Sequence, residues 1–121
     1  MATLERIAPE LPAADLNQAV AHYEQKLGFK VALRLPGNEY AIVERDRVAI
    51  HLFAVAGTKP SAVGVHIFTS DLDQVYSELA RSGATITQGI QRKPWGNREF
   101  RVRDEFGNEL KFTEPLEDEP G

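Results

Sequence analysis

Apolar and polar residues follow a helical period in two segments of this chain, and the two segments are alike. DLNQAVAHYEQKLGF, which begins at Asp15, has apolar residues three and four positions apart, as in an amphipathic helix. DLDQVYSELARSG, which begins at Asp71, has the same period and the same Asp-Leu-x-Gln opening. Aspartate is typical of a helix N-cap, and Gly28 and Gly83 stand where each helix is expected to stop. The pattern predicts two similar helices.

Strand-like segments surround each predicted helix in the same order, with turns rich in Gly, Pro and Asn between them. They cover residues 6–12, 30–35, 39–46 and 47–55 in the first half and 62–69, 84–90, 98–104 and 109–114 in the second. Each half therefore reads β-α-β-β-β. We predict an α+β fold, in which two βαβββ modules form curved mixed sheets around a concave cleft. The expected domain is single, residues 1–121, with repeats at about 5–56 and 61–115.

Alternation within the strands assigns their two faces. Aliphatic positions such as Ile50 and Leu52 suit the layer that meets the helices. The opposite positions combine aromatic rings with imidazoles, and we assign to the cleft His51, Phe53, His66, Phe68 and Lys111. Such a mixture is more typical of a binding cavity than of a plain core, although simple packing remains an alternative for each ring.

The single tryptophan, Trp95, lies between Pro94 and Gly96 in the loop KPWGN, immediately before two strand-like segments. Two interpretations are open at this point. The indole is either a lid over the edge of the core or a flat surface displayed to a ligand.

Composition and charge exclude several classes of protein. The formal net charge is −4, whereas nucleic-acid-binding domains carry a basic face. The chain has no cysteine, so disulfides and thiolate metal sites are excluded. The first residues lack the apolar core of a signal peptide, and no apolar run is long enough to span a membrane. We therefore expect a cytoplasmic protein without a nucleic-acid or membrane partner.

The sequence gives little support to metal or nucleophilic chemistry. A divalent-metal site in an enzyme needs three or four converging nitrogen or oxygen donors. His51 and His66 are candidates, whereas His22, within the first predicted helix, is expected to face outward. No nucleophile elbow and no phosphate-binding loop is present. We therefore expect no metal, no cofactor and no catalytic residue.

Three features of the chain resemble the vicinal-oxygen-chelate (glyoxalase-like) superfamily. They are the repeated order of elements, the sequence LGF at the end of the first helix, and the sequence PWGNREFRVRDEFGN at residues 94–108. Within it they resemble the bleomycin resistance proteins, over about residues 5–115. Enzymes of the superfamily hold a metal at four positions, and on this chain the resemblance matches these to Ala8, His51, Gly64 and Lys111. Only His51 can ligate a metal. The resemblance therefore implies a binding protein rather than an enzyme.

The resemblance further implies a cytoplasmic homodimer. Such a protein would bind a planar, cationic, bleomycin-like antibiotic and give resistance by sequestering it without modifying it. Aromatic side chains would sandwich the flat tail of the drug. The matching positions are Trp95 and Tyr40, with His66 where a relative has an aromatic ring, and Phe53, Phe68 and His51 share the cleft. Two alternatives remain open. One is a metal-independent or divergent enzyme that uses His51 or His66 as acid or base, and the other is a binding protein for another small aromatic molecule.

Overall fold

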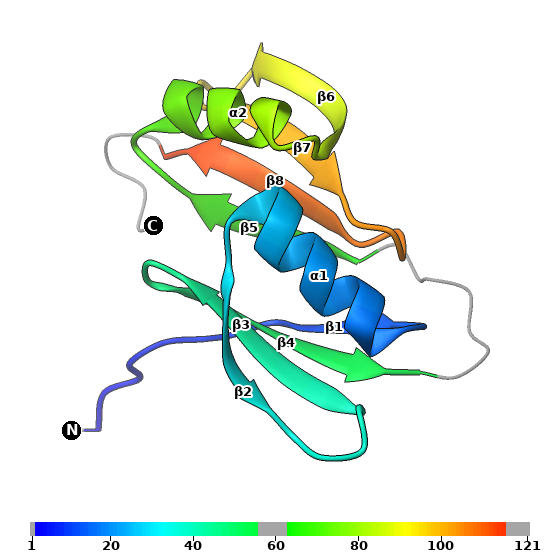
Figure 1. The fold of residues 1–121 in the computed structure, drawn as a ribbon. Coiled ribbons are helices and arrows are strands. Elements are labelled where there is room, and N and C mark those ends of the chain that lie inside the picture. The colour runs from blue at the N-terminus through cyan, green and yellow to red at the C-terminus, as the bar shows by residue number, and fades with distance from the viewer. Residues whose placement is uncertain (1, 56–62, 116–121) are drawn as a thin grey trace.

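The computed structural model describes residues 2–55 and 63–115, and these form two successive βαβββ modules (Figure 1). The first module consists of β1 (Glu10–Ala13), α1 (Leu16–Leu27), β2 (Lys30–Arg34), β3 (Tyr40–Arg45) and β4 (Val48–Ala54). The second consists of β5 (Gly64–Phe68), α2 (Leu72–Arg81), β6 (Thr85–Arg92), β7 (Arg98–Arg103) and β8 (Glu109–Glu114). The predicted α+β fold and order of elements are confirmed. The predicted boundary between the repeats lies outside the described residues.

Each module forms its own mixed sheet of four strands, in the orders β1-β4-β3-β2 and β5-β8-β7-β6. The first strand of each module pairs in parallel with the last, and the other pairs are antiparallel. The parallel registers place Glu10 beside His51 and His66 beside Lys111. Corresponding strands therefore occupy corresponding places in the two sheets.

The ends of the helices follow the predicted capping pattern in α1 more closely than in α2. The carboxylate of Asp15 accepts a hydrogen bond of 3.1 Å from the backbone N–H of Gln18. Gly28 ends α1 in the left-handed conformation, with φ +77°. Asp71 occupies the N-cap of α2, but its side chain makes no capping hydrogen bond, and the helix ends before Gly83.

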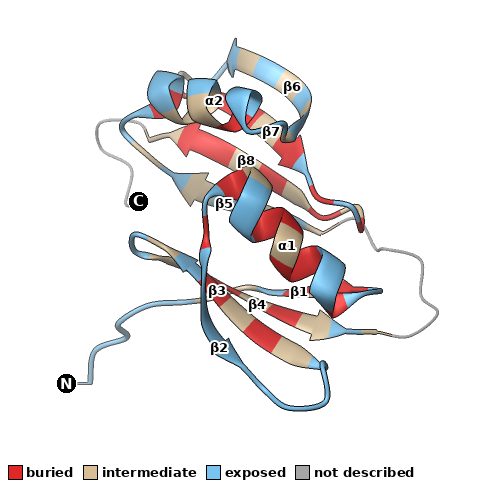
Figure 2. Ribbon diagram, viewed as in Figure 1, coloured by how far each residue is buried: buried red, intermediate tan, exposed pale blue. Residues whose placement is uncertain are grey.

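The hydrophobic core lies between the helices and the inner faces of the sheets (Figure 2). Helix α1 contacts β2, β3 and β4, and α2 contacts β6 and β8. The predicted inner positions Ile50 and Leu52 are fully buried, and one continuous cluster joins both modules. Among the described residues, no helix combines the length and apolar character needed to cross a membrane.

His22 departs from the sequence prediction, because it is buried rather than outward-facing, with 6% of its surface exposed. Its ring lies edge-on to Tyr23, and its Nδ1 is 3.7 Å from the Oε1 of Glu105. Glu105 belongs to the turn between β7 and β8, in the other module. Helix α1 is therefore covered on two sides, whereas the sequence pattern reports only the stripe that faces its own sheet.

That turn is held by a buried polar network. The carboxylate of Asp104 accepts hydrogen bonds from the backbone N–H groups of Phe106, at 2.9 Å, and Asn108, at 3.0 Å. The same carboxylate accepts a hydrogen bond of 2.9 Å from the hydroxyl of Tyr23. The side-chain amide of Asn108 donates to the backbone carbonyl of Pro12 at 2.9 Å. The sequence DEFGN therefore closes a turn and ties it to α1 and β1 of the first module.

Candidate functional site

The face of the first sheet that lies opposite α1 carries the first group of predicted site residues. Tyr40 pairs with Phe53 and Ile42 pairs with His51 in the β3–β4 ladder, and Glu10 lies on the other side of His51. The side chains on this face are half-buried or exposed, whereas the alternate residues of the same strands are buried in the core. The residues named here supply two aromatic rings, an imidazole, a carboxylate and an aliphatic side chain.

Three polar groups on this face are joined by hydrogen bonds. The hydroxyl of Tyr40 donates to the Oε2 of Glu10 at 3.0 Å and also contacts the Nδ1 of His51. The rings of Tyr40 and His51 are edge-to-face, with their centroids 5.6 Å apart. Partial burial and the hydrogen bond to Glu10 raise the pKa of Tyr40 above its ordinary value. The network therefore favours a neutral phenol between a carboxylate and an imidazole.

Sequence reasoning missed Glu10, because it considered only the strands with clear alternation. The strand around ELP is short and carries a proline, and its partner is distant in the chain. The available signal was topological: the first strand of a βαβββ module pairs with the last, which brings Glu10 next to His51.

The outer face of the second sheet carries His66 and Phe68, both exposed. Their rings are stacked, with centroids 6.1 Å apart and an interplanar angle of 21°. The Nδ1 of His66 is 3.0 Å from the Oγ1 of Thr113 on β8, a buried residue that sequence reasoning did not single out. The hydrogen bond anchors the imidazole to β8, and the two nearly parallel rings present aromatic surface to solvent.

A row of paired charges lies beside this aromatic surface, on β7 and the turn that precedes it. Glu99 is only 3% exposed, and its carboxylate is 2.8 Å from the Nε of Arg101 and 4.0 Å from the Nζ of Lys93. Arg101 also lies 3.5 Å from the carboxylate of Glu109. Because each of these charges has an opposite partner, the row stabilises the strand and the base of the turn.

Trp95 lies on this turn, between β6 and β7, and is 63% exposed. The turn is closed by backbone hydrogen bonds from Lys93 to Asn97 (2.8 Å) and from Gly96 to Lys93 (2.9 Å). The guanidinium of Arg92 donates to the carbonyl of Gly96 at 2.7 Å. The indole is therefore displayed on a well-defined turn, and the interpretation of Trp95 as a lid over the core edge does not fit its exposure.

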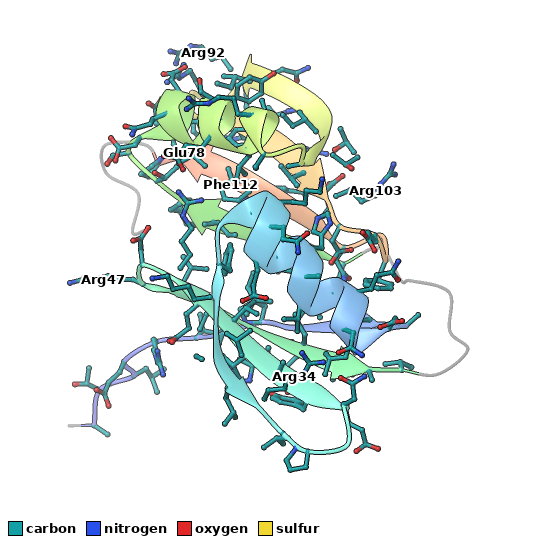
Figure 3. All side chains as sticks on the ribbon, in the orientation of Figure 1. Arg34, Arg47, Glu78, Arg92, Arg103 and Phe112 are labelled. Atoms are coloured by element: carbon teal, nitrogen blue, oxygen red, sulfur yellow. The ribbon has the colours of Figure 1, made fainter. Side chains whose placement is uncertain are left out.

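Two hollows lie next to these faces. A cavity of about 470 Å³ opens between the modules and is lined by residues 7–9, 47–50 and 65–68. Figure 3 shows Arg47, one of its lining residues, projecting outward from the turn between β3 and β4. A second hollow of about 630 Å³ is lined by Leu35, Pro36, Glu39, Tyr40 and Ala54. Both volumes lie in the range of small-molecule sites.

The structure thus divides the six predicted site residues into two groups. Tyr40, His51 and Phe53 lie on the first sheet. The others lie on the second sheet and the β6–β7 turn that leads into it: His66, Phe68 and Trp95. Trp95 and Tyr40, which the resemblance places on either side of one ligand, belong to different modules.

The strand registers show where the positions lie that the resemblance matches to the metal ligands of superfamily enzymes. Ala8 lies before β1, and the residue beside His51 is Glu10. On β5, Gly64 pairs with Glu109 instead of the lysine of β8. A Cβ on Gly64 would nevertheless lie 3.5 Å from the Nζ of Lys111, so these two matched positions are close in space.

The set of four matched positions does not fit a divalent metal within one chain, because Ala8 and Gly64 have no donor atom in their side chains. Its fourth member is Lys111, whose ammonium group carries no lone pair and repels cations. The carboxylate of Glu10 is hydrogen-bonded to Tyr40. Within residues 2–55 and 63–115, no group of three or more His, Asp or Glu side chains is placed to hold an ion.

Comparisons with known proteins agree with this architecture. The sequence model of the glyoxalase/bleomycin resistance protein/dioxygenase superfamily matches residues 3–112. TioX from Micromonospora sp. ML1 is 26% identical with a TM-score of 0.80, over 93% of this chain and 99% of that one. The bleomycin-binding protein of Streptomyces verticillus, solved with copper(II)-bleomycin, is 26% identical with a TM-score of 0.79, over 96% of this chain and 100% of that one. An uncharacterised protein of Mycobacterium bovis is 21% identical over 91% of this chain and 83% of its own length. The chain belongs to the glyoxalase/bleomycin resistance protein/dioxygenase superfamily.

Proposed function

We propose that this protein binds bleomycin-type glycopeptide antibiotics in the cytoplasm and gives resistance by sequestering them without chemical change. The observation that carries the proposal is the exposure of Trp95, whose indole is 63% exposed on a turn held by three hydrogen bonds. A large apolar ring kept in water on an ordered turn is suited to a ligand. The similarity to a bleomycin-binding protein at 26% identity supports the same ligand class.

The chemistry of the two faces suits a planar, cationic molecule. Stacking of a flat heteroaromatic group on an indole contributes about 0.5–1.5 kcal/mol beyond burial. A cation over the ring adds about 0.5–2 kcal/mol. The nearly parallel rings of His66 and Phe68 offer further aromatic surface, and Glu10 supplies a negative charge on the other face.

The proposal includes a homodimer, because each face is open and the site residues of one chain fall into two groups. A second copy that sets the Tyr40 face of one chain against the Trp95 face of the other would complete a sandwich around a flat ligand. The outer faces have residues that remain partly exposed in the single chain, including Phe68 at 37% and Leu33 at 44%. Sedimentation equilibrium with and without drug measures the predicted dimer.

Tryptophan fluorescence tests the proposal directly, because Trp95 is the single tryptophan of the chain. Titration with copper-free bleomycin and with copper(II)-bleomycin should quench it, and calorimetry should give the same affinity. Trp95→Ala should weaken binding at least tenfold, whereas Trp95→Phe should retain part of the affinity. Val31→Ala is the control, because Val31 is also exposed but pairs with the buried Val43, on the face that meets α1. Unchanged binding by Trp95→Ala would remove the indole from the site.

Resistance itself is tested in cells. Cells that express the protein should survive higher bleomycin concentrations than cells that express Trp95→Ala at equal abundance. If the purified protein binds other flat aromatic molecules but not bleomycin, and cells gain no protection, the protein is a binding module for a different ligand.

The network of Glu10, Tyr40 and His51 favours a second candidate function, a metal-independent enzyme. A carboxylate and a phenol that orient an imidazole are the arrangement that general acid–base catalysis uses. The test is turnover of a panel of small metabolites and antibiotics, with and without added divalent metal. Loss of turnover in His51→Gln would support this candidate, and intact drug recovered from the complex would support sequestration.

A further inference from the structure

We infer that the first sheet presents the Nε2 atom of His51 as a hydrogen-bond acceptor, and that this face selects flat ligands carrying N–H donors, above all amidinium- or guanidinium-like cations. The inference deepens the binding function proposed above, because it states that the same face accepts hydrogen bonds from the ligand. It makes Tyr40 and Glu10 positioning residues, which act on the ligand through the imidazole.

The direction of each hydrogen bond in the network follows from counting the protons that are available. The phenol of Tyr40 has one proton, and its hydroxyl donates that proton to Glu10 at 3.0 Å. An ionised carboxylate only accepts hydrogen bonds. The oxygen of Tyr40 is therefore left as an acceptor toward the Nδ1 of His51, which it contacts. A hydrogen bond between these two atoms requires the proton to lie on Nδ1.

The reverse direction is unfavourable at neutral pH. If Tyr40 donated to His51, the phenol oxygen and the Oε2 of Glu10 would lie 3.0 Å apart with no proton between them. The carboxylate of Glu10 accepts hydrogen bonds and supplies no proton of its own. The network therefore runs from His51 through Tyr40 to Glu10.

A neutral imidazole has a single N–H, so a proton on Nδ1 leaves Nε2 with a free lone pair. Among the described residues, the Nε2 of His51 has no hydrogen-bond partner, and the side chain is half-buried on the outer face. Its neighbours in the ladder on that face are apolar on one side, at Ile42, and acidic on the other, at Glu10. The acceptor is thus available to a ligand.

The same surroundings set the class of ligand. Tyr40 and Phe53 are paired residues in the β3–β4 ladder, and their aromatic side chains favour a flat ligand on this face. A cationic N–H donor gains both the Nε2 acceptor and the field of the Glu10 carboxylate. Farther along this face Glu44 pairs with Lys30, so these two charges offset each other. A flat anion would meet a lone pair and a carboxylate, and is rejected.

The tautomer of His51 is measured by long-range ¹H–¹⁵N NMR of the full-length protein without ligand. His51→Gln assigns the resonance among the three histidines. We expect the Nδ1–H form in the unsubstituted protein. Tyr40→Phe should convert it to the Nε2–H form, because the acceptor for Nδ1–H is gone. Glu10→Gln should retain the Nδ1–H form, because a glutamine side-chain oxygen still accepts the phenol proton. An Nε2–H form in the unsubstituted protein, or no change in Tyr40→Phe, would overturn the inference.

The ligand class is tested with benzamidine, a flat cation with N–H donors, and benzoate, a flat anion of the same size. Benzamidine should shift the Nε2 resonance of His51 and bind at least tenfold more tightly than benzoate. Tyr40→Phe should weaken benzamidine binding about fivefold or more. Tyr76→Phe is the matched control and should leave it unchanged. Equal binding of the two probes, or no shift of Nε2, contradicts the inference.

These outcomes are separable from those of the proposed function. Quenching of Trp95 by bleomycin without any effect of benzamidine on His51 would support sequestration and overturn the inference. Benzamidine binding at Nε2 with no response to bleomycin would support the inference and overturn bleomycin as the ligand.

Discussion

The hydroxyl of Tyr23 in α1 donates a hydrogen bond of 2.9 Å to Asp104, at the end of β7, and so joins the two modules inside the protein. Both residues are buried, with 0% and 5% of their surfaces exposed. Burial and the neighbouring carboxylate raise the pKa of Tyr23 well above its ordinary value, so the phenol keeps its proton. The relative placement of the two candidate faces therefore depends on a contact remote from both.

Replacing Tyr23 with phenylalanine should lower the free energy of unfolding by about 1–3 kcal/mol, because it removes a donor from a buried carboxylate. Tyr76→Phe is the matched control, because Tyr76 contacts Phe100 through its ring and makes no hydrogen bond in the described structure. Urea unfolding measures both variants. Equal stability of the two variants would contradict a structural role for the Tyr23 hydroxyl.

Gly28→Ala should destabilise the protein by about 1 kcal/mol or more, because φ is +77° and only glycine adopts this conformation freely. A Cβ at this position would also lie 3.1 Å from the guanidinium of Arg45, which donates to the carbonyl of Leu27 and binds Glu78 of α2. Figure 3 shows Glu78 at the helix of the second module. Gly64→Ala is the control, because its Cβ would make only ordinary contacts at 3.5 Å. Thermal unfolding distinguishes them.

Trp95→Ala should change the free energy of unfolding by less than about 0.5 kcal/mol, because the ring is 63% exposed. Phe100→Ala should lower it by about 3–5 kcal/mol, because Phe100 is fully buried and stacks on Phe112. Figure 3 places Phe112 between the helices and the second sheet. A large loss in Trp95→Ala, measured by urea unfolding, would show that the indole supports the fold and would complicate its proposed role.

Acid should lower the folding stability of the protein, partly because it breaks the ion pairs that Arg98 makes. Its guanidinium binds Glu114 at 2.9 Å and Asp73 at 3.0 Å, and these hydrogen bonds lower the pKa of both carboxyls. Because the folded-state pKa values are lowered, the stabilisation is present above the unfolded value of about 4 and is lost as the pH falls through the folded values.

Arg98→Met should therefore raise the pKa of Glu114 and Asp73 toward ordinary values, as measured by ¹³C NMR titration of the carboxyls. Its stability should fall less steeply than that of the unsubstituted protein between about pH 5 and pH 2. Both ion pairs are partly exposed, so the effect should shrink at high salt. Parallel acid unfolding curves for the two proteins would contradict the prediction.

Glu10→Gln should lower the pKa of Tyr40, because the carboxylate disfavours the phenolate through its hydrogen bond and its charge. Partial burial also raises this pKa, so the shift should be incomplete. Ultraviolet titration of the unsubstituted protein and the variant measures the phenol. An unchanged alkaline titration would show that Glu10 and Tyr40 do not interact in solution.

The sequence was sufficient to predict the elements and the faces of the strands, because local periods determine both. Ile50 and Leu52 are buried and His51 and Phe53 lie on the other face, as alternation predicts. The repeated Asp-Leu-x-Gln opening located both helices within a residue of their observed starts. These features depend on neighbours along the chain.

The composition of the site could not be predicted in the same way, because it depends on pairing between distant strands. Glu10 lies beside His51 through the register of a parallel pair, which has no tight turn to fix it. His22 is buried by a turn from the other module. A single helical stripe of apolar residues contains no information about that second contact.

The parallel pairing of β1 with β4, and of β5 with β8, has a consequence for biosynthesis. Within the part of the chain that the structure describes, each first strand pairs only with the last strand of its own module, so it stays unpaired on the ribosome until that strand emerges. The N-terminal sheet is completed when His51 to Ala54 have been made, and the C-terminal sheet only when Glu109 to Thr113 have followed. A nascent chain stalled before Glu109 therefore exposes a bare strand in its second half, and is the species that chaperones and proteases should recognise.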